Sequence, residues 1–571
     1  MRPITDNMKT AIAQLNIKNG QLSLNFQKIR ILVDEAKKQQ AELIVFPALS
    51  ISGLCVGDRW LEEDFNSSIE HYNDELVKLA DGIDILFGSI HRQHGMRFSA
   101  AYLASNQQLV KANTGLDAVL KDEPSHFRGF DEEKWFSYGG GNQYFDYKGI
   151  KMGVTLSDEF TANDKVDLQV IIADRPYTIA PVRKSKGKYL FVNSVGSQNT
   201  GHSVFVMSGN SGYYEDGKKL WGCDASFEQQ LVVRALECRE DVPCEQSLLD
   251  ALCSGIREFD QEQFSASMKW VIGLSGGLDS SVSAALLVRA LGADRVVGYN
   301  MATHYNSIQT KDNARNLANR LGMKIREGSI EPIVDATVKV LAEYGYDEEY
   351  PSLIYENIQA RIRGHMLSSF ASVENGVIIN NGNKVETALG YCTLYGDSIG
   401  ALSPLADLTK VQMFDLSREI NAAYGREVIP LNLLPEVSED GMKWETPPSA
   451  ELRDNQRDPM KWFYHDYVID HIMADPDYLV KLMKQYLSRS IYKTEIGRWI
   501  KYYGLEEPAA FIEDVEWIRK NMQRNIFKRV QAPPVIAVTD YAFGSTRYET
   551  QGRIDNGMEY EKLKQEILQM K

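Results

Sequence analysis

A glycine- and serine-rich segment with one carboxylate separates two hydrophobic stretches in the middle of this chain. It consists of Gly273, Leu274, Ser275, Gly276, Gly277, Leu278, Asp279 and Ser280. Glycines let backbone N–H groups approach an oxyanion, and the N-terminus of a following helix adds partial positive charge. The lysine of a Walker-type loop is absent. We therefore predict a phosphate-binding loop in which Asp279 ligates Mg²⁺.

The elements around this loop predict a unit of the parallel β/α type. Residues 270–274 have the apolar pattern of a buried strand, and residues 281–291 the pattern of a helix. A second strand is expected at 296–301 and a second helix at 310–321. Alternation of strands and helices indicates a parallel sheet covered by helices on both faces.

The N-terminal half also has an α/β pattern. A helix is expected at 25–40, and strands are expected at 10–15, 43–46, 83–87, 152–156 and 168–172. Residues 222–245 are charged and mixed, which indicates a boundary between domains. We expect one domain over residues 1–240 and a second over residues 245–571.

Composition excludes several classes of protein. The net charge of −15 argues against a nucleic-acid or membrane-surface partner, since both require basic patches. No apolar run reaches the length of a membrane span or a signal-peptide core. The six cysteines form no C-x-x-C pair, as expected for reduced thiols in a cytoplasmic protein.

The phosphate loop resembles that of the ATP pyrophosphatases, which transfer AMP from ATP to a substrate. Six further motifs follow in order and resemble those of the NAD+ synthetases. They occupy residues 356–363, 382–386, 390–397, 407–410, 447–452 and 528–544. The resemblance implies a Rossmann-like domain that uses ATP and Mg²⁺ to convert deamido-NAD+ into NAD+ through an adenylate, releasing AMP and pyrophosphate.

The resemblance also implies roles for single residues. Asp279, Glu386 and Lys410 are the expected catalytic residues, and Asp279 and Glu386 the expected magnesium ligands. Residues 273–280 and Asn381 are expected to bind ATP. Asn357, Glu386 and Lys528 are expected to bind deamido-NAD+.

Two segments depart from the family pattern. Asn381 replaces a threonine, and Val385, whose side chain cannot form a hydrogen bond, replaces a serine. Residues 301–304 read Met-Ala-Thr-His where Met-Pro-Ser-Arg is usual. These changes lie in segments expected to contact ATP, and they leave room for a modified substrate.

Residues 8 to about 235 resemble the nitrilase-type amidase domain of glutamine-dependent NAD+ synthetases. The resemblance covers residues 46–53, Lys121 with 130–132, and 153–159, and implies an αββα sandwich. The family's general base is here Ala48 and its nucleophile Ser157, while the lysine remains as Lys121. Alanine cannot accept a proton, and a serine needs a base more than a cysteine does. We therefore predict a degenerate glutaminase domain and the use of free ammonia.

Three alternatives remain open at this point. The chain is a glutamine-dependent NAD+ synthetase if Ala48 and Ser157 are engineered or compensated. It is a different ligase if the adenylated carboxylate is not deamido-NAD+. It is a non-catalytic nucleotide-binding scaffold if both halves have lost activity. The expected partners are deamido-NAD+, ATP and ammonia, together with a second copy of the chain bound through the synthetase domain.

Overall fold

The chain divides into two compact units in this computed structural model, which describes residues 7–570 except 126–129, 141–142, 157–165, 181–185, 241, 243–244, 347–351, 454–455, 545–547 and 553. The first unit runs to Glu258 and includes Ala537–Asp540, and the second comprises Phe259–Ile536 and Tyr541–Lys571. Helix α3 (Leu248–Gln263) spans the division.

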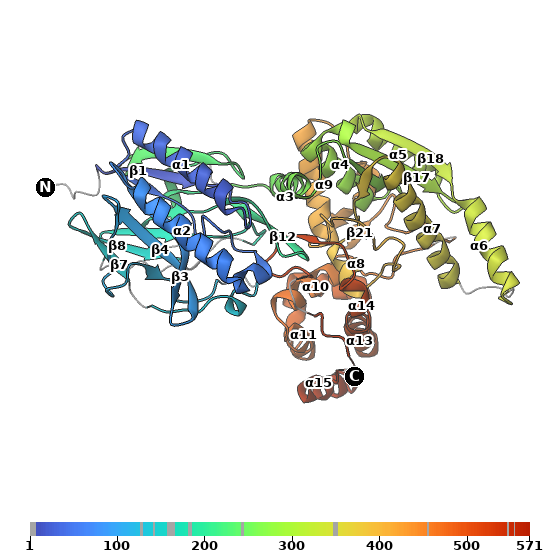
Figure 1. The fold of residues 1–571 in the computed structure, drawn as a ribbon. Helices are drawn as coiled ribbons and strands as arrows, with labels where there is room; N and C mark the ends of the chain where they lie inside the picture. The colour runs from blue at the N-terminus through green and yellow to red at the C-terminus, as the bar shows by residue number, and fades with distance from the viewer. Residues whose placement is uncertain are drawn as a thin grey trace. The chain divides into compact units, whose positions relative to one another are not determined.

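The first unit is built around two β-sheets. One sheet has the strand order β15-β1-β2-β3-β4-β5, with β6 paired to β4. Its strands are β1 (Lys9–Gln14), β2 (Leu43–Val45), β3 (Asp84–Gln93), β4 (Met96–Ser105), β5 (Gln108–Leu109), β6 (Val119–Leu120) and β15 (Gln230–Ala235). Helices α1 (Leu22–Lys38) and α2 (Glu63–Leu79) lie side by side against this sheet (Figure 1).

The second sheet has the strand order β14-β13-β10-β9-β8-β7. Its strands are β7 (Tyr144–Tyr147), β8 (Ile150–Thr155), β9 (Leu168–Ile172), β10 (Lys188–Val192), β13 (Gly212–Glu215) and β14 (Lys218–Gly222), and a further hairpin joins β11 (Val195–Asn199) to β12 (Ser203–Ser208). Alternate side chains of β9, such as Val170 and Ile172, meet residues of the first sheet in a shared core, because successive residues of a strand face opposite sides.

Three layers of the expected αββα sandwich are present in the described residues: the α1–α2 layer and the two sheets. A helix layer on the outer side of the second sheet is not among those residues. Ile171, Tyr189 and Tyr214 cluster on that side, where the two tyrosine rings stack.

The second unit contains a parallel four-stranded sheet with the order β18-β17-β16-β19. The strands are β16 (Lys269–Gly273), β17 (Val296–Ala302), β18 (Lys324–Ser329) and β19 (Gly376–Ile378). The chain moves outward from β16 to β18 through α4 (Leu278–Leu291) and α5 (Ile308–Leu321), then returns to β19 through α6 (Glu331–Glu343) and α7 (Ser352–Val373). Right-handed crossovers therefore place α7 on the opposite face from α4 and α5.

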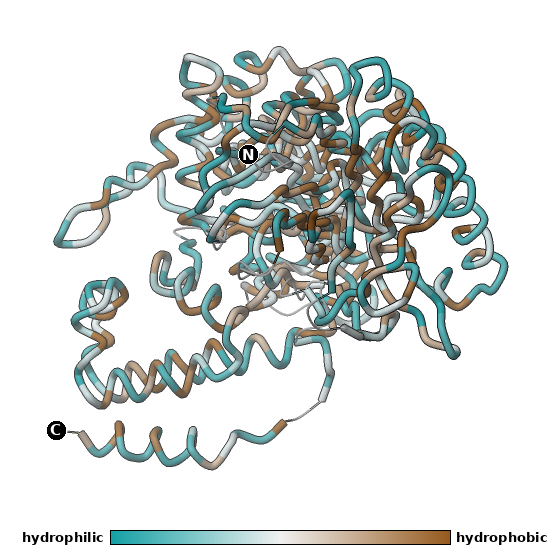
Figure 2. The backbone as a smooth tube through the Cα atoms, turned by 90° about the vertical axis from the view of Figure 1, so that its left-hand side faces the viewer, coloured by the Kyte–Doolittle hydropathy of each residue, from teal (hydrophilic) through white to brown (hydrophobic). Residues whose placement is uncertain are grey.

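A helical region follows the sheet. It begins with α8 (Lys384–Leu389) and α9 (Lys410–Tyr424), continues through the hairpin β20 (Glu436–Ser438) and β21 (Gly441–Lys443), and ends with α10 (Tyr464–Ala474), α11 (Tyr478–Leu487), α12 (Glu495–Tyr502), α13 (Pro508–Arg524), α14 (Ile526–Arg529), β22 (Val535–Ala537) and α15 (Met558–Leu568). The helices from α10 onward share one apolar core. In Figure 2, brown and teal alternate along the helix that ends at the C-terminus, α15, as expected for an amphipathic helix.

The α/β fold class expected from the sequence, with a parallel sheet in the second domain, is confirmed. None of the helices in the described part of the chain is long and apolar enough to cross a membrane.

Candidate active site

A cavity of about 360 Å³ opens at the carboxyl ends of β16, β17 and β19. The strand order reverses between β16 and β19, and open α/β sheets bind ligands at such a point. Of the expected site residues, those lining it are Gly273, Leu274, Ser275, Gly277, Leu278, Asp279, Ser280, Asn381, Glu386, Lys410 and Lys528. The structure therefore brings most of the residues singled out from the sequence to one place.

The segment after β16 has the geometry of an anion-binding loop. The backbone N–H of Gly277 donates to Ser275 Oγ over 3.2 Å, and helix α4 begins at the next residue. Ser280 Oγ lies 3.2 Å from Ser275 Oγ, so both hydroxyls stand at the helix N-terminus. That terminus carries partial positive charge and lies beside the cavity.

Gly276 has a structural role in this loop and does not line the cavity. Its φ is +83°, and a Cβ atom there would lie 1.8 Å from the carbonyl oxygen of Thr310. Only glycine allows the loop to approach α5 so closely.

Asp279 is held by two residues from distant parts of the sequence. Its Oδ1 lies 2.6 Å from Lys410 Nζ, at the start of α9. Its Oδ2 accepts a hydrogen bond of 3.2 Å from Asn383 Nδ2. The motif at 382–386 thus positions the phosphate-loop carboxylate, a role for Asn383 that the sequence analysis did not assign.

Glu386 is positioned by the capping box of α8. Asn383 Oδ1 accepts the backbone N–H groups of Val385 and Glu386 at 3.1 Å, and Glu386 Oε2 accepts the N–H of Asn383 at 3.3 Å. Val385 is fully buried in the helical core. The departure from serine at this position is therefore accommodated by packing.

The carboxylates near Lys410 have altered acidity. Burial, followed by the charge of Asp279, raises the pKa of Glu386 well above its usual range. Burial also raises the pKa of Asp458 to about 6, although Lys410 opposes this. Burial acts to lower the pKa of Lys410, but Asp279 and Glu386 outweigh it and hold the pKa above its usual range. Lys410 is a cation in this site at neutral pH.

Lys384 lies in the same motif as Glu386, but it does not line the cavity and instead forms ion pairs that anchor this motif inside the protein. Its Nζ lies 3.1 Å from Asp407 and 2.7 Å from Asp470, and its side chain is 1% exposed. Asp407 belongs to the motif at 407–410, so this ion pair joins two of the family motifs inside the protein.

The residues expected to bind deamido-NAD+ differ in their placement. Lys528 lines the cavity, and its Nζ donates to the carbonyl oxygens of Gly390 and Cys392 at 2.9 and 2.6 Å. Asn357 is not among the lining residues, and its Oδ1 accepts a 2.8 Å hydrogen bond from Thr393. Asn381 Nδ2 donates to the carbonyl oxygen of Gly273 at 3.2 Å, while its Oδ1 is buried and has no hydrogen-bond partner among the described residues.

Five charged residues that were not selected from the sequence also line the cavity: Arg363, Asp397, Glu451, Asp458 and Arg529. Burial raises the pKa of Asp397, and burial lowers the pKa of Arg363 to about 10. Arg363 and Asp397 lie in the motifs at 356–363 and 390–397, so their place in these motifs could have marked them as site residues in the sequence. Asp458 lies in an irregular segment, and only the tertiary structure places it here.

Two of the residues expected to form a degenerate amidase site, Ala48 and Lys121, are described and belong to the first unit. The third, Ser157, lies outside the described residues. Ala48 is 3% exposed and lies in the core between the sheets. Lys121 Nζ lies 2.8 Å from Glu132 Oε1 and 2.7 Å from Ser125 Oγ, and the lysine is 1% exposed. The retained lysine is thus neutralised by a buried carboxylate.

Comparison with known proteins agrees with these features. A family model described as carbon-nitrogen hydrolase matches residues 9–191, and one described as NAD synthase matches residues 248–497. A glutamine-dependent NAD(+) synthetase of Synechocystis sp. is 29% identical, covering 94% of this chain and 97% of its own length. One of Acinetobacter baylyi is 27% identical, with coverages of 79% and 85%.

Two solved structures share the fold over the whole chain. The glutamine-dependent NAD+ synthetase from Acinetobacter baumannii in complex with ADP has a TM-score of 0.65 and 23% identity, covering 95% of this chain and 98% of its own. That from Cytophaga hutchinsonii has a TM-score of 0.74 and 16% identity, with coverages of 98% and 100%.

Proposed function

Since this chain belongs to the NAD synthetases, a family of carbon–nitrogen ligases, and carries a nitrilase-like domain, we propose that it amidates deamido-NAD+ at the expense of ATP and takes its nitrogen from free ammonia. The observation that carries the first part is the ion pair of Asp279 and Lys410 beside the phosphate loop in a single cavity.

The cavity contains hydrogen-bond donors and a cation that can bind the phosphates of a nucleoside triphosphate. The loop after β16 offers backbone N–H groups and serine hydroxyls, and Lys410 offers a buried cation next to them. Asn381 Oδ1 is a buried acceptor that no described residue pairs with, which suits a donor group of a bound nucleotide.

The carboxylates fit a Mg²⁺ ion that arrives with its nucleotide. Among the described residues, no three His, Cys, Asp or Glu side chains are grouped to hold a metal by themselves. Mg²⁺ is commonly bound through one or two carboxylates together with substrate phosphates and water. Asp279 and Glu386 would supply the two carboxylates, and the ion would neutralise phosphate charge.

The proposed reaction has two steps. An oxygen of the nicotinate carboxylate attacks the α-phosphorus of ATP, which releases pyrophosphate and leaves an acyl adenylate. Ammonia then attacks the acyl carbon and displaces AMP, and the surplus proton leaves with solvent. Lys410 stabilises the phosphate charge that develops. Lys528, through the carbonyl oxygens of Gly390 and Cys392, and Asn357, through Thr393, position the segment that receives the dinucleotide.

The proposal that free ammonia is the nitrogen donor rests on residues of the first half of the chain. A glutaminase of this type needs a base and a nucleophile, and those positions hold Ala48 and Ser157. Lys121, the retained member, is already paired with Glu132. Loss of members of a catalytic set that acts as a unit costs on the order of a millionfold.

One alternative has its own support. The similar proteins from Synechocystis and Acinetobacter are named glutamine-dependent, so a compensated glutaminase site would give this chain the same donor. Amidation of another carboxylate, and nucleotide binding without turnover, remain the further alternatives.

One assay separates these possibilities. The purified chain is supplied with ATP, Mg²⁺ and deamido-NAD+, and with either ammonium or glutamine. We expect NAD+ and AMP in equal amounts with ammonium and no NAD+ with glutamine. Equal rates with both donors, with glutamate released in step, would identify a working glutaminase. ATP binding without AMP release would identify a scaffold, and AMP release with another carboxylate only would identify a different ligase.

Two further properties belong to this proposal. A homodimer through the synthetase domain, implied by the family resemblance, is tested by light scattering of the purified chain. Cytoplasmic location, indicated by the cysteine pattern, is tested by cell fractionation.

A further inference from the structure

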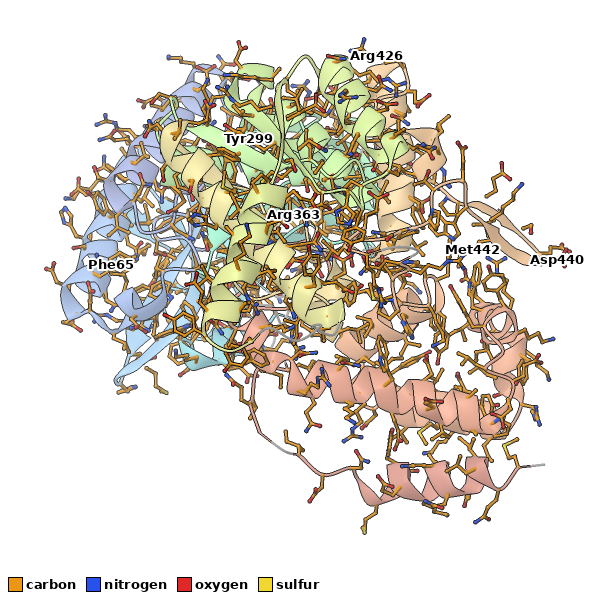
Figure 3. All side chains as sticks on the ribbon, turned by 90° about the vertical axis from the view of Figure 1, so that its right-hand side faces the viewer. Phe65, Tyr299, Arg363, Arg426, Asp440 and Met442 are labelled. Atoms are coloured by element: carbon orange, nitrogen blue, oxygen red, sulfur yellow. The ribbon has the colours of Figure 1, made fainter. Side chains whose placement is uncertain are left out.

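Arg363 stands on α7 and lines the cavity from the face opposite the phosphate loop's helix α4. Its Nε donates to the carbonyl oxygen of Met301 at 3.2 Å, near the end of β17. Its Nη2 lies 3.5 Å from Asn306 Oδ1. Figure 3 labels Arg363 and, in the same unit, Tyr299 of β17.

The remaining nitrogen of this guanidinium lacks a partner. Nη1 is buried and makes no hydrogen bond to any described residue. A buried donor left unpaired destabilises the protein, and more so when it is charged. Native proteins therefore leave such groups unpaired mainly where a ligand or ordered water completes them.

No carboxylate in the described part of the chain is close enough to form an ion pair with Arg363. Asp397 and Glu451 act on it only through their charge. Glu451 instead accepts hydrogen bonds from Asn306 and Thr310, at 3.1 and 2.8 Å. The guanidinium is held in place by neutral oxygens, and its charge is left available to the cavity.

The other basic side chain near this strand end is turned away. His304, at the end of the segment where the family pattern has an arginine, lies 2.5 Å from Glu331 through its Nδ1, and its side chain is 58% exposed. Within the described residues, Arg363 is therefore the cation that this side of the cavity presents next to Met301.

We propose that Arg363 is a further substrate-binding residue, whose Nη1 donates to an anionic oxygen of a bound substrate. This inference rests on the proposed function, which supplies two sources of such an oxygen: a phosphate of ATP and the nicotinate carboxylate of deamido-NAD+. A guanidinium suits either, because its planar donors match both kinds of oxyanion.

The test is titration calorimetry of the full chain with each ligand separately. One ligand is the Mg²⁺ complex of α,β-methylene-ATP, and the other is deamido-NAD+. Arg363→Met removes every hydrogen-bond donor of the side chain, whereas Arg363→Lys keeps the positive charge but loses the planar arrangement of guanidinium donors. Arg426→Met is the matched control, because Arg426 is exposed, donates to the carbonyl oxygen of Arg320 and is not a cavity residue.

We expect Arg363→Met to lower the affinity for one of the two ligands at least tenfold and to change the affinity for the other less than threefold. Arg363→Lys should lie between, and Arg426→Met should match the unmodified chain. The ligand whose affinity falls identifies the oxyanion that Arg363 binds, a phosphate of ATP or the nicotinate carboxylate. Unchanged affinity for both ligands would overturn the proposal, as would an equal loss for both with a lowered melting temperature, which indicates a structural role. Failure of the unmodified chain to bind either ligand would instead count against the proposed function.

Discussion

Lys410 Nζ lies 2.6 Å from Asp279 Oδ1, although 131 positions separate the two residues in the chain. The lysine opens helix α9 and the aspartate stands in the first turn of α4. This ion pair joins the phosphate loop to the motif at 407–410 in a largely buried setting.

The first prediction concerns Asp279. Asp279→Asn keeps the shape of the side chain but removes its charge, so Lys410 loses its ion-pair partner and, under the proposed function, Mg²⁺ loses a ligand. We expect pyrophosphate release to fall by roughly 10²-fold or more, measured in a coupled assay. Asp415→Asn is the control, because Asp415 is exposed on α9 and pairs only with Arg418 among the contacts described. Near-normal release by Asp279→Asn would remove the basis for this site.

The second prediction compares two neighbouring glycines. Gly276→Ala places Cβ 1.8 Å from the Thr310 carbonyl oxygen at a φ of +83°, whereas Gly277→Ala places it 3.3 Å from Ser275 Oγ. Strain of this kind costs of order 1–3 kcal/mol, and the clash adds to it. Thermal melting should show a clear loss for Gly276→Ala and a small one for Gly277→Ala. Equal losses would mean that the loop adapts to the added carbon.

The third prediction concerns the anchor Lys384. Lys384→Met leaves the carboxylate of Asp407, itself fully buried, without this cation. Breaking a buried pair by removing one partner typically costs about 3–5 kcal/mol. The melting temperature should fall accordingly. Lys562→Met, at an exposed helix position, should leave it within the experimental error; an equal effect of the two changes would contradict the anchoring role.

The fourth prediction concerns the buried carboxyl group of Asp466, which accepts the backbone N–H groups of Lys410 and Phe463 at 2.6 Å. Burial raises its pKa from 3.8 to about 6, so the folded state binds a proton more tightly than the unfolded one. The stability from this group is present below pH 4 and is lost as the pH rises through about 6, to a total of roughly 3 kcal/mol.

Asp466→Asn removes this titration, and its amide nitrogen cannot accept the second N–H group. The unmodified chain should therefore be the more stable protein, and its advantage in melting temperature should narrow from pH 5 to pH 7.5. A gap that stays constant over this range would show that Asp466 titrates normally.

The fifth prediction concerns the proposed loss of amidase activity in the first unit. Ser157→Cys alone should not restore glutamine use, because Ala48 still cannot accept a proton. The double change Ala48→Glu with Ser157→Cys should release glutamate from glutamine above the background of the unmodified chain, since Lys121 remains in place with Glu132. Glutamate release by the single variant at the rate of the double variant would show that another group acts as the base.

The phosphate loop and its flanking elements could be predicted from the sequence because their signals are local. The strand at β16, the glycines and the helix α4 are contiguous, and their expected bounds differ from the observed ones by at most three residues. The residues at the expected base and nucleophile positions of the first half, Ala48 and Ser157, can likewise be identified from the sequence alone.

Only the tertiary structure decided which charges meet. Asn383, Lys410 and Asp279 come together through contacts across more than a hundred residues. The pKa of Asp458 depends on burial by segments that have no local pattern. Arg363 could be seen in its motif, but its unpaired nitrogen could not. Sequence by itself determined the local elements and the chemical groups available, because these depend on neighbouring residues; the pairing and desolvation of those groups depend on long-range packing, which the fold alone supplies.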